Sequence, residues 1–320
     1  MRYKADRTPA ARLRNADPHL PRATGTLAHL SAGPPTFDLQ SHSLHSDGAL
    51  RPREVVAAAE SAGVELLALT DHDTVDGVDE ATRAAAEVGI SLVPAIEISA
   101  LDAGNGDLHI LGYLIDDRDP ALLERLRVNR AERERRADAM AQALRDTGFV
   151  VDEDSLRQRA ARGGSIGRPH LAAAVVSEPA NAARLAAEGC LEPSAFLVAY
   201  LVEGKTGFKP RAAPSVPEAI EAIHAAGGVA VWAHPFWDVA EPREVLDAID
   251  RFHSAGLDGV ECFYATHTRE QTGLLAEHCA RRGLLSTGSA DFHGPAHKHF
   301  SRFRAFSTYG HQPVLGPIAG

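Results

Sequence analysis

Short apolar segments alternate with helix-like segments along most of this sequence, and the alternation limits the folds that the chain can adopt. A helix is predicted from Pro52 to Gly63, because proline favours the first helical position and glycine favours a helix end. An apolar run at 65–69 follows this helix. Further apolar runs are found at 90–96, 108–115, 229–232, 257–263 and 284–288, and further helical patterns at 78–88, 217–226, 241–255 and 269–282. Strands that alternate with helices are typical of a parallel α/β architecture.

The alternation is interrupted once, by residues 118–210. A long helical pattern spans 119–145, and shorter helical pieces follow it. We therefore expect a helical insertion at 118–210 that divides one α/β domain into two parts, 36–117 and 211–310.

An arginine-rich run at 125–136 lies inside the long helical pattern. Its arginines alternate with glutamates at helical spacing, which favours a solvated helix face. Binding of phosphate by this run is the alternative.

The two ends of the sequence do not continue the alternation. Residues 1–35 mix Arg, Pro, Ala and Gly without apolar periodicity and without the apolar core of a secretory signal, so a flexible N-terminal tail is predicted. Residues 311–320 are assigned to a C-terminal tail.

The composition excludes several classes of protein. The 320 residues, 44% of them hydrophobic, are enough for a core without disulfides. Three cysteines without a Cys-x-x-Cys pair argue against a disulfide framework or a cysteine zinc site and predict a cytoplasmic protein. A net charge of −10 argues against duplex nucleic acid and anionic membranes as partners, and no apolar run is long enough to span a membrane. The oligomeric state is left open.

Histidine is the unusual component, with 16 residues. Histidines and acids recur at the ends of the apolar runs, and the carboxyl ends of parallel strands share one rim in α/β folds. Gln40 and His42 lie two apart on a strand and should point to the same side, and a turn at Asp47 should return a carboxylate over that side. Taken singly, each of these residues has a plain alternative as a helix cap or a turn residue. The expected metal ligands are His42, Asp47, His72, Glu97, His109, His234, Asp291 and His293.

This set contains imidazoles and carboxylates but no thiolate. Such mixed nitrogen and oxygen ligands suit Mn²⁺, which we favour, and also Fe²⁺ or Zn²⁺. The number of ligands is sufficient for two or three divalent ions.

Six ordered motifs resemble those of the PHP (polymerase and histidinol phosphatase) family of metal-dependent phosphoesterases. They are Asp38–His42 with Ser46–Gly48, Leu67–Thr74, Ile96–Ser99, Leu108–Tyr113, Ala233–Pro235 and Asp291–Gly294. Within the family, the chain resembles most the branch of nucleoside 3′,5′-bisphosphate phosphatases and 5′-3′ exoribonucleases, which also carries a helical insertion. The resemblance implies a distorted seven-stranded βα barrel with a trinuclear metal site at its carboxyl rim.

One position departs from the family pattern, because Gln40 stands where the first histidine of a His-x-His motif is expected. A glutamine offers a metal only a neutral carbonyl oxygen. Three interpretations follow: a two-metal enzyme, a weakened enzyme, or a descendant that only binds a phosphorylated ligand.

The resemblance implies hydrolysis of phosphate esters by a metal-bridged hydroxide. Arg168 and Lys205 are expected to clamp phosphate, His170 to contact the substrate, and His267 to contact phosphate or protonate the leaving oxygen. The expected substrates are 3′,5′-bisphosphonucleotides or the 5′ ends of short oligonucleotides, because an insertion over the barrel mouth limits access. A cyclic-phosphate phosphodiesterase and a sugar or histidinol phosphatase are the alternatives with the same fold.

Overall fold

The structure is a computed structural model that describes residues 35–104, 106–161, 166–210 and 213–320. The flexible tail expected at 1–35 lies outside the described residues, apart from Pro35.

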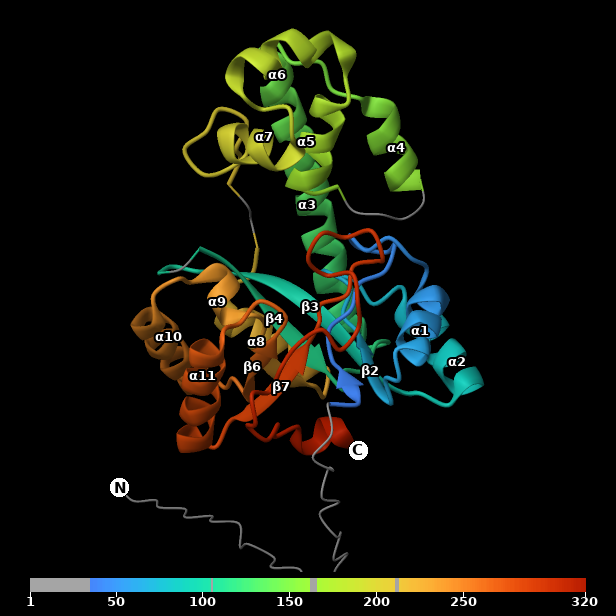
Figure 1. Cartoon of the computed structure of the whole chain (residues 1–320), viewed down its shortest axis with the longest axis vertical. Helices are drawn as coiled ribbons and strands as arrows, with labels where there is room; N and C mark the ends of the chain where they lie inside the picture. The colour runs from blue at the N-terminus through green and yellow to red at the C-terminus, as the bar shows by residue number, and fades with distance from the viewer. Residues whose placement is uncertain (1–34, 105, 162–165, 211–212) are drawn as a thin grey trace, which may run out of the picture. The chain divides into compact units, whose positions relative to one another are not determined.

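Seven strands form one sheet, and they pair in the order in which they occur along the chain (Figure 1). The strands are β1 (Phe37–Asp38), β2 (Leu66–Leu69), β3 (Ser91–Asp102), β4 (Gly106–Tyr113), β5 (Val229–Trp232), β6 (Gly259–Tyr264) and β7 (Leu285–Ser289). The two edges of the sheet approach each other, since the backbone N–H of Leu39 donates to the carbonyl of Gly288 over 3.2 Å. The sheet is thus a nearly closed barrel, which confirms the predicted fold class.

Strand β4 differs from the parallel arrangement that the alternation predicted. It pairs antiparallel with both β3 and β5, whereas the other neighbouring strands run parallel. The connection from Asp102 to Gly106 is too short for a crossover helix, so the chain must turn back. The start of β4 therefore lies beside the end of β3, and His109 pairs with Ser99 at that rim.

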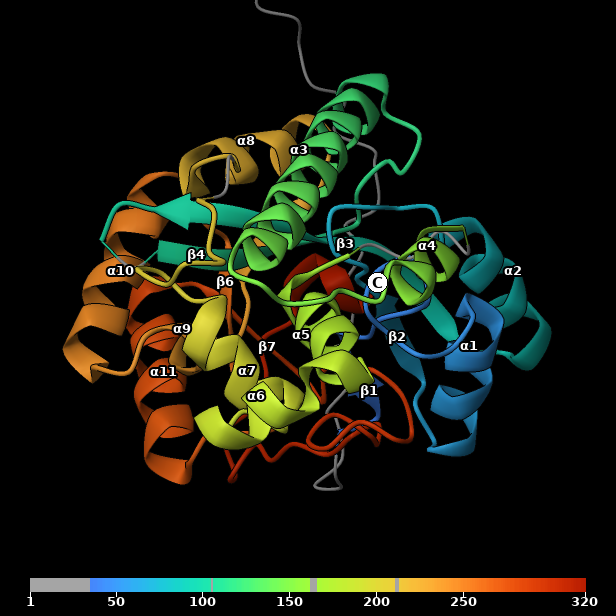
Figure 2. The same cartoon turned by 90° about the horizontal axis from the view of Figure 1, so that it is seen from above.

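Helices surround the strands in the view from above (Figure 2). They are α1 (Pro52–Ser61), α2 (Val78–Val88), α8 (Val216–Ala225), α10 (Pro242–Ser254) and α11 (Arg269–Arg282). Each buries a regular apolar face: on α10 this face consists of Val245, Ala248, Ile249 and Phe252. Helix α2 ends at Gly89, whose φ of 81° is left-handed and suits glycine at a helix end.

A second group of helices lies between β4 and β5, where the sequence predicts an insertion. It contains α3 (Pro120–Asp146), α4 (Glu153–Ala161), α5 (Arg168–Val176), η1 (Pro179–Asn181), α6 (Ala182–Glu188) and α7 (Pro193–Tyr200). The group has a core of its own that includes Met140, Leu144 and Phe196. Helix α3 also reaches the barrel, because Leu122 and Leu126 near its start belong to the core under the sheet.

The residues assigned to a C-terminal tail, 311–320, contact the barrel at several points. Val314 pairs with Ser286, which extends the sheet locally, and Leu315 and Ile318 are buried against the barrel. Burial of these apolar side chains holds residues 314–318 against the barrel. Among the described residues, no helix is long and apolar enough to cross a membrane.

We predict that Asn181→Ala destabilises the helices of the insertion. The buried Asn181 side chain accepts from the N–H of Val150 over 3.0 Å and donates to the carbonyls of Val150 and Val175 over 2.7 and 2.8 Å. Loss of these bonds removes the Asn181 partner of the Val150 N–H and carbonyl and one of the two donors to the buried Val175 carbonyl, so urea unfolding should show a free energy of unfolding lower by about 2–3 kcal/mol. The exposed Gln142→Ala is the control, and equal stability of both variants would contradict the role of Asn181.

Candidate metal centre

All eight predicted ligands lie at one rim of the barrel. His42, His72, His234, Asp291 and His293 follow the ends of parallel strands, Asp47 lies in the loop after β1, Glu97 lies within β3, and His109 lies near the start of β4. Because β4 is antiparallel, its start meets the carboxyl ends of the other strands. The topology therefore brings together residues that are up to about 250 positions apart in the sequence.

The fully buried carboxylate of Glu97 is the centre of this group. Its Oε1 atom lies 2.8 Å from His109 Nδ1 and 3.2 Å from His234 Nε2. Its Oε2 atom lies 3.1 Å from His42 Nε2 and 3.4 Å from His72 Nδ1. A single carboxylate thus contacts four imidazoles, and its two oxygens face different pairs of them.

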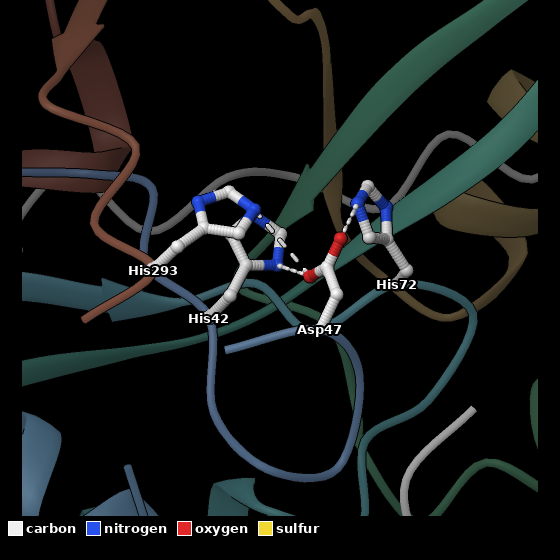
Figure 3. A group of neighbouring side chains, drawn as sticks. All are labelled: His42, Asp47, His72 and His293. Carbon is white, nitrogen blue, oxygen red and sulfur yellow. Dashed lines mark ion pairs between the residues drawn. The ribbon is translucent and has the colours of Figure 1, made fainter. Parts of the chain in front are cut away.

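A second carboxylate, Asp47, faces three imidazoles (Figure 3). Asp47 Oδ1 lies 3.6 Å from His42 Nδ1 and 3.4 Å from His293 Nε2, and Asp47 Oδ2 lies 3.5 Å from His72 Nε2. The third carboxylate, Asp291, places Oδ1 3.1 Å from His42 Nε2. His42 and His72 connect the surroundings of Asp47 to those of Glu97.

The charges of these groups stabilise one another. Burial alone would raise the pKa of Glu97, but His72 and His109 hold it well below its usual range. Burial alone would lower the pKa of His42, but the carboxylates of Asp291 and Glu97 raise it well above its usual range. The carboxylates are therefore ionised and require positive charge beside them, from protonated imidazoles or from cations.

The residues fit divalent metal ions. Two groups each place their ligand atoms within 4.8 Å of one another: His42, Asp47, His72 and His293, and His72, Glu97 and His109. Among the described residues, His42 Nε2, His72 Nδ1, His109 Nδ1 and Asp291 Oδ1 are buried polar atoms without a hydrogen-bond partner. Buried polar atoms without a partner lower the free energy of unfolding unless a ligand bonds to them. Imidazole nitrogens and carboxylate oxygens are established metal ligands.

Three of the six non-glycine residues with positive φ in the described part of the chain lie at this rim. His234 and Asp291 have φ values of 31° and 54°, and Asp73 has 53°. Non-glycine residues rarely adopt this left-handed region, and such strain clusters at functional sites. The sharp turns let His234 and Asp291 direct their side chains inward directly after β5 and β7.

Asp71 fixes the loop that carries His42 and Asp47. This buried carboxylate accepts from the N–H and the hydroxyl of Ser43 over 2.7 and 2.6 Å and from the hydroxyl of Ser46 over 2.7 Å. Asp71 belongs to a motif seen in the sequence, but its role there could be recognised only once these contacts were known. It acts on the ligands through the loop rather than as a ligand itself.

Gln40 occupies the position of the missing histidine and is fully buried. Its Nε2 atom donates to Glu97 Oε2 over 3.1 Å, and its Oε1 atom accepts from the Ser289 hydroxyl over 3.4 Å. Because an ionised carboxylate only accepts hydrogen bonds, the amide nitrogen must be the atom that faces Glu97. Gln40 and His42 therefore both contact Glu97 Oε2. Their side chains point to the same side of the chain, as the sequence predicts.

A pocket of about 550 Å³ lies over these ligands, within the usual size range of small-molecule sites. Its opposite wall comes from the insertion and carries Arg133, Arg136, Arg168 and His170. Arg168 is 35% exposed, and its guanidinium lies 3.8 Å from Asp107. Arg168 and His170 thus reach the pocket, as the sequence led us to expect.

Two expected substrate contacts are not brought to this pocket. Lys205 is exposed in the turn after α7 and does not line the pocket. His267 is buried behind Tyr264, with its ring centroid 5.3 Å from that of Tyr264, and burial lowers its pKa to about 4. A neutral, enclosed imidazole is poorly suited to protonate a leaving group.

Arg133 and Arg136, from the arginine-rich run at 125–136, line the pocket. The sequence favours a solvated face for this run, with phosphate binding as the alternative, and Arg127 and Arg135 do lie exposed beside neighbouring glutamates. Arg133 instead turns to the barrel, where it contacts Asp73 and donates to the Ser99 hydroxyl over 3.0 Å. The direction of α3 across the rim decides which arginines reach the pocket, and a local sequence pattern does not determine that direction.

Comparisons with known proteins agree with this geometry. The PHP domain matches residues 38–152. The chain is 37% identical to the 5′-3′ exoribonuclease of Haemophilus influenzae, over 81% of this chain and 90% of the relative, and 34% identical to the 3′,5′-nucleoside bisphosphate phosphatase of Chromobacterium violaceum, over 88% and 93%. A solved structure from Bifidobacterium adolescentis, described as a metal-dependent phosphoesterase, superposes with a TM-score of 0.70 at 32% identity, covering 83% of this chain and 91% of the other.

The chain therefore belongs to the PHP domain family, and its fold is that of a metal-dependent phosphoesterase. It is a hydrolase that acts on phosphoester bonds. The predictions of family, fold and enzyme class are confirmed.

We predict that Asp71→Asn weakens metal binding although Asp71 is not a ligand. The amide cannot accept from all three of its donors, so the loop with His42 and Asp47 loosens. Loss of such a supporting contact typically lowers metal affinity about 10- to 100-fold, which a Mn²⁺ titration would measure. Asp247→Asn on the outer side of α10 should bind as the unaltered protein does, and equal affinity in both variants would contradict this role.

Proposed function

We propose that this protein hydrolyses phosphate esters of nucleotides, either 3′,5′-bisphosphonucleotides or the 5′ ends of short oligonucleotides. The observation that carries the proposal is the arrangement of charges around one pocket. Ionised carboxylates and imidazoles form its floor, and arginines from the insertion form its opposite wall. With divalent ions held by the floor, a phosphate between floor and wall would meet cations on both sides, and arginine can bind it through two parallel hydrogen bonds.

The eight rim residues are our proposed ligands for divalent ions, with Mn²⁺ favoured by their mixed nitrogen and oxygen donors. Such ions supply an activated water and neutralise charge on the phosphoryl oxygens. The chain's own part is to orient the ligands. Glu97 keeps four imidazoles in place, and Asp238 lies 3.4 Å from His234 Nδ1, which fixes the direction of that ring.

Gln40 favours two ions rather than three. Its amide nitrogen faces Glu97, so at this position the chain presents a hydrogen-bond donor where a ligand atom is required. Ser289 also bonds to the buried carboxyl of Glu261 over 2.5 Å, and burial raises the pKa of Glu261 to about 8. A neutral hydrogen-bonded chain from Gln40 to Glu261 then occupies this part of the site.

We predict two metal equivalents per chain, and three in Gln40→His. An imidazole at position 40 replaces the amide donor by a ligand beside Glu97. Metal analysis after dialysis against Mn²⁺ measures the content, and Gln142→His on the exposed face of α3 controls for adventitious binding by an added histidine. Three equivalents in the unaltered protein, or no gain in Gln40→His, would contradict the proposed role of Gln40.

A second cavity of about 420 Å³ supports the oligonucleotide alternative. It adjoins the first pocket, with which it shares His72 and Arg133, and it continues between α3 and α4 past Arg130 and Arg157. The cavity gives a short chain room beyond its first nucleotide.

Phosphate release is the direct test of the proposed function. With Mn²⁺, the protein should release phosphate from adenosine 3′,5′-bisphosphate or shorten a 5′-phosphorylated oligoribonucleotide, and His72→Ala and Asp291→Ala should lose most of this activity. Arg168→Ala should raise KM on the order of tenfold, since a charged hydrogen bond to phosphate is lost, whereas Lys205→Ala should not. Hydrolysis of a cyclic phosphodiester or a sugar phosphate alone would favour the alternatives, and binding without turnover would favour a non-catalytic module.

We also propose a cytoplasmic location. All three cysteines are buried free thiols, and Cys262 Sγ and Cys279 Sγ share a hydrogen bond over 3.6 Å. Such a pair suits a reducing compartment.

A further inference from the structure

An exposed tryptophan stands at the mouth of the pocket. Trp237 lies in the short helix α9 (Pro235–Asp238), three residues after the proposed ligand His234, and it lines the same pocket. It is 54% exposed, and in the described part of the chain it is the one aromatic residue among the exposed large hydrophobics. An exposed tryptophan gives up the favourable free energy of burial, and in the lining of a pocket its ring is available to a ligand.

The Trp237 ring is held from one side by an aromatic group. Its centroid lies 5.5 Å from that of the buried Phe300, with 63° between the rings. Phe300 in turn stacks on His297, at 5.1 Å and 15°, and its carbonyl accepts from the N–H of His293 over 2.9 Å. The ring is therefore tied to the loop that carries a proposed metal ligand, and its position relative to the metal centre is defined.

Charged groups lie on two sides of the pocket, although the insertion also contributes the apolar side chains of Met140, Ile166 and Leu171. The floor carries the ligand cluster, and the insertion contributes Arg133, Arg136 and Arg168. When a substrate places its phosphate among these groups, the pocket must still accommodate the uncharged part of the substrate. Trp237 and Phe300 provide aromatic surface for that part at the pocket mouth.

We propose that Trp237, supported by Phe300, is the stacking platform for the base of a nucleotide substrate. This inference rests on the proposed function and adds the residue that selects base-bearing esters over sugar phosphates. Every nucleobase has a flat π face, so stacking on an indole recognises a base without reading its edge. The enzyme should accordingly accept different bases and discriminate strongly against abasic substrates.

Kinetics with and without a base test the proposal. The ratio of kcat/KM for adenosine 3′,5′-bisphosphate to that for the abasic ribose bisphosphate should fall on the order of tenfold in Trp237→Ala, through KM rather than kcat. Trp237→Phe keeps an aromatic face and should retain most of the ratio. Leu191→Ala, another exposed apolar residue and one that does not line the pocket, is the control. An unchanged ratio in Trp237→Ala would overturn the proposal.

Intrinsic fluorescence gives a second measurement that needs no turnover. The chain has two tryptophans, and Trp232 is fully buried in the core, so a ligand at the pocket mouth acts on Trp237. Adenosine 5′-phosphate should quench the emission and ribose 5-phosphate should not, and the quenching should disappear in Trp237→Phe.

The two measurements separate the failure of this inference from that of the proposed function. If adenosine 5′-phosphate inhibits hydrolysis but leaves the emission unchanged, stacking is wrong and the phosphoesterase stands. If the protein hydrolyses no phosphate ester but the emission is quenched only by the nucleotide, the proposed function fails and the base platform stands.

Discussion

The contact of the Glu97 carboxylate with four imidazoles is the interaction on which the site depends. An ionised carboxylate that is fully removed from water costs several kcal/mol unless positive partners surround it. Those partners come from β4 and from the ends of β1, β2 and β5, so the charge of Glu97 is balanced only when the strands have assembled in this order. The metal centre therefore forms only when the barrel has folded.

The insertion turns an exposed rim into a pocket. Helix α3 begins in the barrel core and ends in the core of the insertion, so it connects the two and directs Arg133 and Arg136 toward the ligands. Metal ions at the floor would bind phosphate of any origin. Differences between substrates must come from the wall and the mouth, where Arg168 and Trp237 lie.

Much of this arrangement follows from local sequence patterns. The bounds of α2, α11 and β5 agree with the predicted ranges, because glycine caps and apolar periodicity act over a few residues. Most of the proposed ligands stand out in the sequence because they lie at the end of an apolar run or just after it. The antiparallel direction of β4, the enclosure of His267 and the distance of Lys205 from the pocket could not, since they depend on how segments remote in sequence pack.

Anomalous X-ray scattering from crystals grown with Mn²⁺ tests the central claim most directly. The account predicts two manganese peaks, one in each of the two groups of ligand atoms described above, with Gln40 in contact with neither. A structure without manganese at this rim, or with manganese bound only elsewhere on the protein, would contradict the account. The two predicted groups are His42, Asp47, His72 and His293, and His72, Glu97 and His109.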